Sequence, residues 1–132
     1  MIERKRRTLD LYKKVGAEAR LFKHILTSFI VDVSCVLYSS DTDRWYKVER
    51  LAEALISNAE DQMFKDHPTL GNDYTDVFYG GLSLNPSSNV DIEVMKIMKS
   101  FVEDILAKIN ENLLPFNEKE GGHLNERAPL EK

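Results

Sequence analysis

The side chains with the clearest chemistry in this sequence are positively charged residues in its first half. A short basic cluster opens the chain, and further basic residues follow before and after a long apolar stretch. If the fold brings them to one edge, they could neutralise nucleic-acid phosphates and release counterions. The alternative interpretation is that they are scattered, solvated charges. The residues are Arg4, Lys5, Arg6, Arg7, Lys13, Lys14, Arg44 and Lys47.

A second group of polar residues is acidic. Glu60 and Asp61, with Glu53 and Glu49 one and two turns earlier on a predicted helix, would form one acidic helix face. An ordinary solvated surface is the simpler interpretation of such a face. Asp104 stands apart from this group, among large apolar residues, where a carboxylate needs either a partner or access to water.

No set of residues in the sequence has the spacing of a catalytic or metal site. His24, His67 and His123 show no consistent ligand spacing, and Glu120 lies near His123 but around two glycines rather than on a helix. The sequence therefore predicts a non-enzymatic protein without a cofactor, a metal or a small-molecule substrate.

Composition favours one small globular domain. The chain has 132 residues, 42% of them hydrophobic and 30% charged, with a net charge of −4. This acidic balance argues against nucleic-acid binding by the whole surface, although a local basic patch is compatible with it. The lone Cys35, expected in a buried helix, favours a reducing, intracellular location. No signal peptide or run of 18 apolar residues is visible, so we expect no membrane partner.

The most informative pattern is a motif that occurs twice. It reads ILTSFIVDV over residues 25–33 and IMKSFVEDI over residues 97–105, and both copies lie in long helix-periodic segments. Such a repeat suggests two copies of one helical unit that bury each other. We therefore predict that two long helices cross near Phe29 and Phe101, and that the first of them is surrounded by other elements.

Hydrophobic spacing and helix breakers predict an all-α chain. Gly16 is expected to interrupt the first helix, Ser39 to Asp43 to form a loop, and Pro115 to end the last helix. Ser88 and Asp91 have the spacing of a capping box. The expected helices cover residues 9–15, 17–38, 45–64, 74–79 and 91–114, and a polar tail covers residues 117–132.

Local sequence adds a family resemblance. The segment 86–105 resembles, without a gap, the loop and central helix of core histones of type 2B. The segments 15–22 and 50–61 are similar to the type 2A partner. In the type 2B segment the matching residues are Pro86, Met95, Ile97, Met98, Ser100, Phe101, Val102, Asp104 and Ile105, followed by Ile109.

The resemblance implies a fused histone pair, as in the histone doublets of some large DNA viruses. It implies two short–long–short helical units in a head-to-tail handshake, the second lacking a clear third helix. The first unit would cover residues 1–66, the second residues 67–116, and the tail residues 117–132. A nuclear or virion location would follow from this family.

The resemblance also implies roles for the polar residues. Lys13, Lys14, Arg44 and Lys47 would lie near DNA-facing loops, and Lys14 falls where type 2A histones carry a minor-groove arginine. The acidic face would dock arginine-bearing peptides, and Asp104 would contact a neighbouring histone pair. At the start of the last long helix the sequence departs from the family pattern. There, Asp91 and Glu93 would repel phosphate.

Two functions are therefore expected. The first is a histone-like protein for DNA packaging and chromatin architecture, which binds double-stranded DNA through its first half and other histone-fold proteins through its second. The alternative is an acidic helical module, of histone fold or plain bundle, that binds protein and not DNA. In that case another chain would complete the fold, and self-association is expected.

Overall fold

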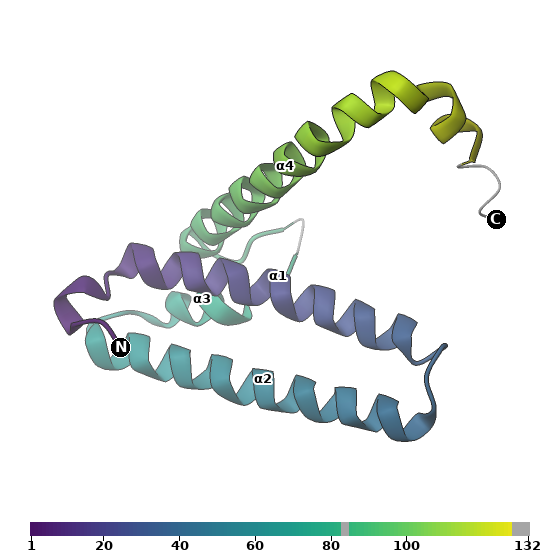
Figure 1. The fold of residues 1–132 in the computed structure, drawn as a ribbon. Helices are drawn as coiled ribbons and strands as arrows, with labels where there is room; N and C mark the ends of the chain where they lie inside the picture. Colours follow the sequence, from purple (N-terminus) through teal and green to yellow (C-terminus); the bar gives the residue numbers. More distant parts are fainter. Residues whose placement is uncertain (83–84, 128–132) are drawn as a thin grey trace. The chain divides into compact units, whose positions relative to one another are not determined.

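A computed structural model describes the backbone of residues 1–82 and 85–127, and the side chains of residues 1–82 and 85–114. Within these ranges the chain is helical and contains no strand, as the hydrophobic spacing predicted (Figure 1). The elements are the 3-10 helix η1 (Arg4–Arg6), α1 (Leu9–Val33), α2 (Ser39–Asp66), the 3-10 helix η2 (Asn72–Thr75), α3 (Asp76–Tyr79) and α4 (Asn89–Arg127).

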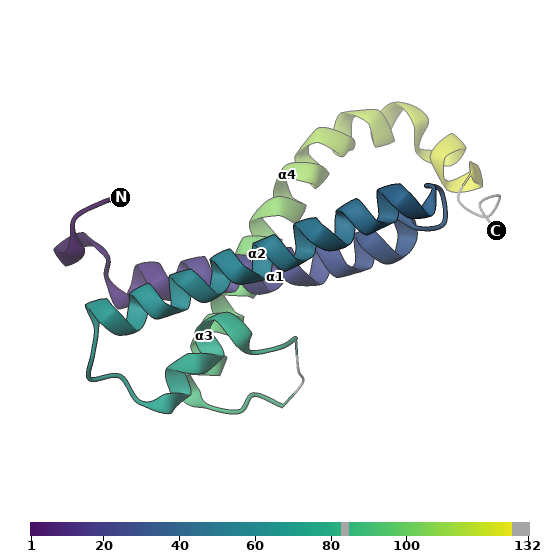
Figure 2. The same cartoon turned by 90° about the horizontal axis from the view of Figure 1, so that it is seen from below.

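Helices α1 and α2 form an antiparallel hairpin (Figures 1 and 2). Thr8 begins α1 as its N-cap, because its side chain accepts a hydrogen bond from the Leu11 amide at 3.2 Å. Near the connecting loop, the ring of Phe29 meets that of Trp45 edge-on at 4.8 Å between centroids. The hairpin therefore holds two long helices side by side.

The core lies where α3 and the first turns of α4 pack against one side of this hairpin. Figure 2 shows α3 on that side of α1 and α2. The core contains side chains from each of the four helices. They are Tyr12, Ala17, Met63, Val77, Phe78, Val90, Val94 and Met98.

Packing groups the chain into two units that meet inside α4. The first unit covers Met1–Met98 and the second Lys99–Lys132. The boundaries that the sequence analysis expected, after residues 66 and 116, stay a prediction. Because α3 and the start of α4 bury their apolar side chains against α1 and α2, residues 67–98 belong with the hairpin.

The sequence analysis expected Gly16 to interrupt the first helix. In the structure Gly16 lies inside α1 and is buried. A Cβ atom at this position would collide with the carbonyl oxygen and Cγ1 of Val77. Glycine is thus required here for the close approach of α3 to α1, and the helix accepts its lower propensity.

Several predicted helix boundaries were wrong. The first loop comprises residues 34–38, where Cys35 is exposed, and Ser39 to Asp43 form the first turn of α2. At the other end α4 continues beyond Pro115 to Arg127, since a proline removes one backbone donor without ending every helix. Of the predicted tail, residues 117–127 are therefore helical, and residues 128–132 lie outside the described part.

The short–long–short order is not found in the first half, where α1 and α2 are both long. The second half does have the predicted order, with the short α3 followed by the long α4. The predicted contact between Phe29 and Phe101 would join the two units and stays a prediction. Half of the capping box is present, because the Asp91 amide donates to Ser88 Oγ at 3.1 Å, while the Asp91 carboxylate accepts from the Ser87 amide at 3.0 Å.

Candidate protein-interaction surface

A buried ion pair fixes the hairpin to α4. The Arg20 guanidinium donates to the Asp91 carboxylate at 2.7 Å, with side chains 1% and 4% exposed, and also to the Asp76 carbonyl. Burial alone would raise the pKa of Asp91, but the bonds from the Ser87 amide and from Arg20 leave it below its ordinary value. Asp91, which the sequence analysis read as a barrier to phosphate, is therefore part of the core.

A second buried carboxylate, that of Asp66, lies at the end of the hairpin near the N-terminus of the chain. Asp66 accepts two hydrogen bonds from Arg7, at 2.6 and 2.9 Å, one from Tyr12 Oη at 2.5 Å and one from Gln62 at 3.0 Å. These bonds, the Arg7 bond first, hold the pKa of Asp66 well below its usual range. Burial of Tyr12 and, to a smaller extent, its hydrogen bond to Asp66 raise the pKa of Tyr12 to about 12. This carboxylate ties α2 to the start of the chain.

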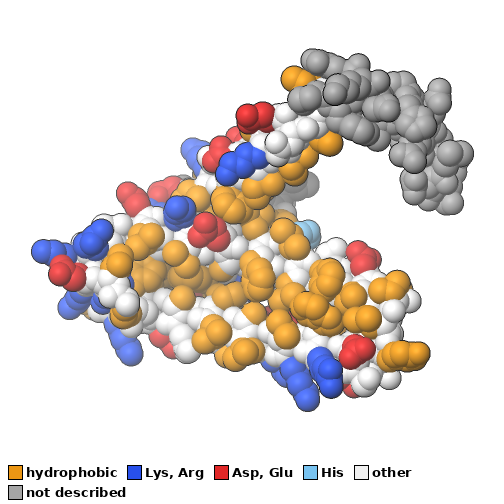
Figure 3. All heavy atoms as spheres, in the orientation of Figure 1, with side chains coloured by type: hydrophobic (Ala, Val, Ile, Leu, Met, Phe, Trp, Pro, Cys, Tyr) orange, Lys and Arg blue, Asp and Glu red, His pale blue; other side chains and the backbone are white. Residues whose placement is uncertain are grey.

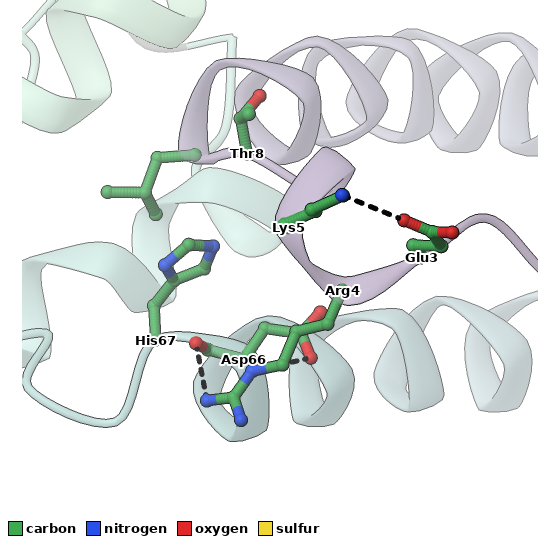
Figure 4. A pocket seen from close by; sticks show the side chains of 7 residues that line it. Glu3, Arg4, Lys5, Thr8, Asp66 and His67 are labelled. Atoms are coloured by element: carbon green, nitrogen blue, oxygen red, sulfur yellow. Dashed lines mark hydrogen bonds and ion pairs between the residues drawn. The ribbon is translucent and has the colours of Figure 1, made fainter.

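A shallow pocket of about 720 Å³ lies beside Asp66. Figure 4 shows Arg4, Lys5 and Glu3 around it, with Lys5 paired to Glu3 at 3.5 Å. Arg4 donates to the Asp66 carbonyl at 3.0 Å and lies 3.8 Å from its carboxylate. The charged side chains that line the pocket are thus paired with one another. We therefore interpret the pocket as part of the packing at this end of the hairpin.

The structure does not bring the eight predicted DNA-contacting residues to one edge. Arg4 to Lys14 lie at one end of the hairpin, and Arg44 and Lys47 lie at the other, roughly 25 Å away along the helices. Lys13 is paired with Glu93, and Arg44 lies 3.7 Å from Asp41. Three of the predicted set are exposed and form no ion pair with another described residue, namely Arg6, Lys14 and Lys47.

The predicted acidic face is divided. Glu49 accepts a hydrogen bond from Thr27 at 3.2 Å, and Glu53 lines a pocket beside α3. Burial raises the pKa of Glu60, and its neighbour Asp61 raises it further. Asp61 itself is exposed about 100° farther round α2. Asp104 is exposed on α4 and has no described partner, which favours the water-facing alternative.

The largest unassigned feature is an apolar surface on the side of the hairpin that faces away from α3. Figure 3 shows hydrophobic side chains gathered along this side of α1 and α2. Ile25 and Leu51 are 64% and 62% exposed, so water surrounds most of each side chain. We call this surface the open face. It consists of Val15, Phe22, Ile25 and Phe29 of α1 and Val48, Leu51 and Leu55 of α2.

The open face contains a groove at the end nearer the N-terminus of α1. Its volume is about 440 Å³, and apart from Glu18 its lining is apolar. Its lining combines the small side chains of Ala19 and Ala52 with larger ones such as Phe22 and Leu55. A groove of this kind between two helices can accept side chains from another helix.

A second apolar surface lies in the other unit. Residues of α4 that follow one another by three or four positions are 37–50% exposed, so one stripe of this helix is in water within its unit. We call it the α4 stripe. It consists of Phe101, Val102, Ile105, Leu106, Ile109 and Leu113.

The sequence analysis missed the open face because it expected the first long helix to be surrounded. The signal was present in the sequence: α1 and α2 carry more apolar side chains than two helices, one short helix and the start of α4 can cover. Leu26 and Ile30 are buried, whereas Ile25 and Phe29 beside them stay exposed.

No protein-family model, curated protein or solved structure matches this chain. Among the described residues, none of the helices has the length and apolar character needed to cross a membrane. Nor does this part of the chain contain three or more His, Cys, Asp or Glu side chains placed to hold a metal ion.

Proposed function

We propose that this chain is a helical protein-interaction module that binds its partner through the open face. The observation that carries this proposal is the exposure of large apolar side chains along two adjacent helices. At their exposed fractions they leave roughly 700 Å² of apolar surface in water, taking roughly 200 Å² for a large side chain in full. That is somewhat above the usual range for the largest patch of a monomer, and exposed patches of this size mark interaction sites.

The chemistry of the open face favours a protein partner. An apolar groove beside protruding aliphatic side chains suits another helix, which buries its own apolar face there. Nucleic acid would require positive charge instead, and the chain has a net charge of −4. The α4 stripe offers a second surface of the same kind, so the module could bind more than one helix.

Photo-crosslinking tests this proposal. A photoreactive amino acid replaces Leu51 on the open face, and a control variant carries it at Val31, which is 60% exposed elsewhere on α1. In cells that express the chain, we expect adducts larger than the chain from position 51 and few from position 31. Equal yields at both positions, or no adduct at position 51, would contradict the proposal.

A histone-like DNA-packaging protein is the second candidate, with a histone-fold pair as its finer fold. The short-then-long helix order of α3 and α4 supports it, together with the family-like segment at residues 86–105. The exposed Arg6, Lys14 and Lys47 could contact phosphate, although Arg7 and Lys13 are bonded to carboxylates.

A gel shift on duplex DNA at about 50 mM salt tests this second candidate. We expect binding that weakens with salt and falls further in Lys14→Glu, while Lys99→Glu serves as a control in the second unit. Absence of binding by the wild-type protein at this salt concentration would remove the DNA function and leave the interaction module.

A further inference from the structure

We infer that the open face binds a second copy of the same chain, so that two α1–α2 hairpins pack antiparallel as a four-helix bundle. This inference rests on the proposed function and names its partner. Three properties of the open face support it: its area, the position of its groove, and the charges along its edges.

The area fits one interface between two copies. A standard interface buries roughly 800 Å² on each partner, of which roughly 60% is apolar. The open face offers roughly 700 Å² of apolar surface before its polar edge is counted. A self-complementary contact with this area would cover the exposed side chains and leave the α3 side of the hairpin unchanged.

The shape of the open face is suited to a twofold arrangement. Its groove lies between Val15 and Phe22 on α1, whereas Ile25, the most exposed side chain of the open face, protrudes nearer the connecting loop. In a twofold contact, if a first patch of one copy meets a second patch of the other copy, then the second patch of the one also meets the first patch of the other. If the copies run antiparallel, the protruding end of one therefore lies over the groove end of the other.

The pairing of α1 with α2 shows which residues of the two helices are level, and so where an axis that crosses both helices would cut each of them. Tyr12 bonds to Asp66 at one end of the hairpin, and Phe29 packs on Trp45 near the other. Residue 23 of α1 is consequently level with about residue 54 of α2. An axis at this level passes close to the exposed Ile25 and Leu51, which would then lie near their own counterparts in the second copy.

The charges along the edges agree with the same axis. Lys14 and Asp32 lie at equal distances on either side of residue 23, about five full turns apart, so they share one side of α1. An antiparallel second copy brings Lys14 of each chain to the level of Asp32 of the other. Both residues are exposed, and neither forms an ion pair with another residue that the structure describes.

The edge formed by α2 repeats this arrangement. Lys47 and Asp61 lie at equal distances on either side of residue 54, about four turns apart. They too are exposed, with no ion pair to any residue that the structure describes. One axis therefore pairs opposite charges on both edges of the open face, twice on each edge.

The mass of the purified chain in solution tests this inference. Light scattering at about 100 µM should give twice the chain mass of 15.2 kDa for the wild type and a single chain for Ile25→Glu. Val31→Glu is the matched control, because it places the same charge at a similarly exposed apolar position of α1 outside the open face, and it should remain a dimer. Circular dichroism and thermal melting would establish that both variants fold.

A wild type that is monomeric at this concentration would overturn the inference, as would equal masses for the two variants. Dimers lost through Ile105→Glu in the α4 stripe but retained in Ile25→Glu would overturn it as well. If Leu51 crosslinks to another protein while the purified chain stays monomeric, this inference fails and the proposed interaction module stands.

Charge reversal tests the antiparallel register. Lys14→Asp and Asp32→Lys should each raise the dissociation constant about tenfold, because each change affects both symmetric pairs of the dimer. The double variant restores opposite charges, so its dissociation constant should return to within about threefold of the wild type. Additive losses in the double variant would overturn this register.

Discussion

Both sides of the α1–α2 hairpin carry large apolar side chains, but the two sides differ in their polar contacts. On the α3 side, Val77 and Phe78 are fully buried, and the Arg20–Asp91 pair fixes the start of α4. On the open face, Ile25 and Leu51 are as apolar but mostly in water. Apolar residues thus line both sides, and directional contacts occur on the side that the chain covers itself.

This difference separates two kinds of helix face. A face that the same chain covers contains groups that fit one neighbour, such as Gly16 against Val77 or the buried guanidinium of Arg20. A face for another molecule can be apolar in its centre and charged at its edge, as many interfaces are. Substitutions on the two sides should therefore have different consequences.

The largest effect is expected at the buried ion pair. Asp91→Ala would leave the Arg20 charge buried without its carboxylate, which should lower the free energy of unfolding by about 3–5 kcal/mol in urea titrations. Glu93→Ala removes the carboxylate that pairs with Lys13 at the surface and should cost less than about 1 kcal/mol. Similar losses in the two variants would show that the pair does not hold α4 in place.

Neighbouring residues of α1 offer a direct comparison of the two environments. Leu26 is 7% exposed, so Leu26→Ala should lower the free energy of unfolding by about 2–4 kcal/mol. Ile25→Ala should change it by about 0.5 kcal/mol or less, measured in denaturant titrations at concentrations where the chain is monomeric. A large loss at Ile25 in the monomer would mean that the same chain covers the open face.

A smaller effect is expected where α1 touches α3. Gly16→Ala should destabilise the chain by about 1–3 kcal/mol, because the new Cβ collides with Val77, even though alanine favours helix. Gly71→Ala is the control, since a Cβ there meets nothing within 4 Å, and it should be neutral or stabilising. Equal stabilities of the two variants in thermal melts would contradict the close approach of α3.

The smallest effect concerns acid pH. The pKa of Asp66 is lowered in the folded chain, so its contribution to stability is present above the ordinary pKa near 3.8 and is lost as the pH falls below it. Asp66→Asn should be less stable than the wild type at pH 7, and the gap between their melting temperatures should narrow toward pH 2.5. A gap of the same size at both pH values would contradict this contribution of Asp66.

Part of this fold could be predicted from local sequence. The sequence predicted an all-helical chain and the end of a short helix at Tyr79, and Ser88 marked the cap of α4. Gly16 was misread because its role depends on Val77, which lies far away in the sequence. A local pattern cannot distinguish a glycine that breaks a helix from one that admits a neighbour.

The candidate site was harder to predict for a related reason. Periodicity identifies the apolar sides of α1 but does not show which of them the same chain covers. The basic residues illustrate the same limit, because Arg7 bonds to Asp66 although 59 positions separate them, whereas Lys14 remains exposed. Long-range partners decide whether a charge belongs to the fold or to a surface.

The most direct test of the central claim is carbene footprinting of the purified wild-type chain across a range of concentrations. The open face should be covered at high concentration, so labelling of Leu51 should fall as the concentration rises while labelling of the equally exposed Val31 stays constant. Constant labelling of both residues at every concentration would contradict the claim that the open face binds a second copy.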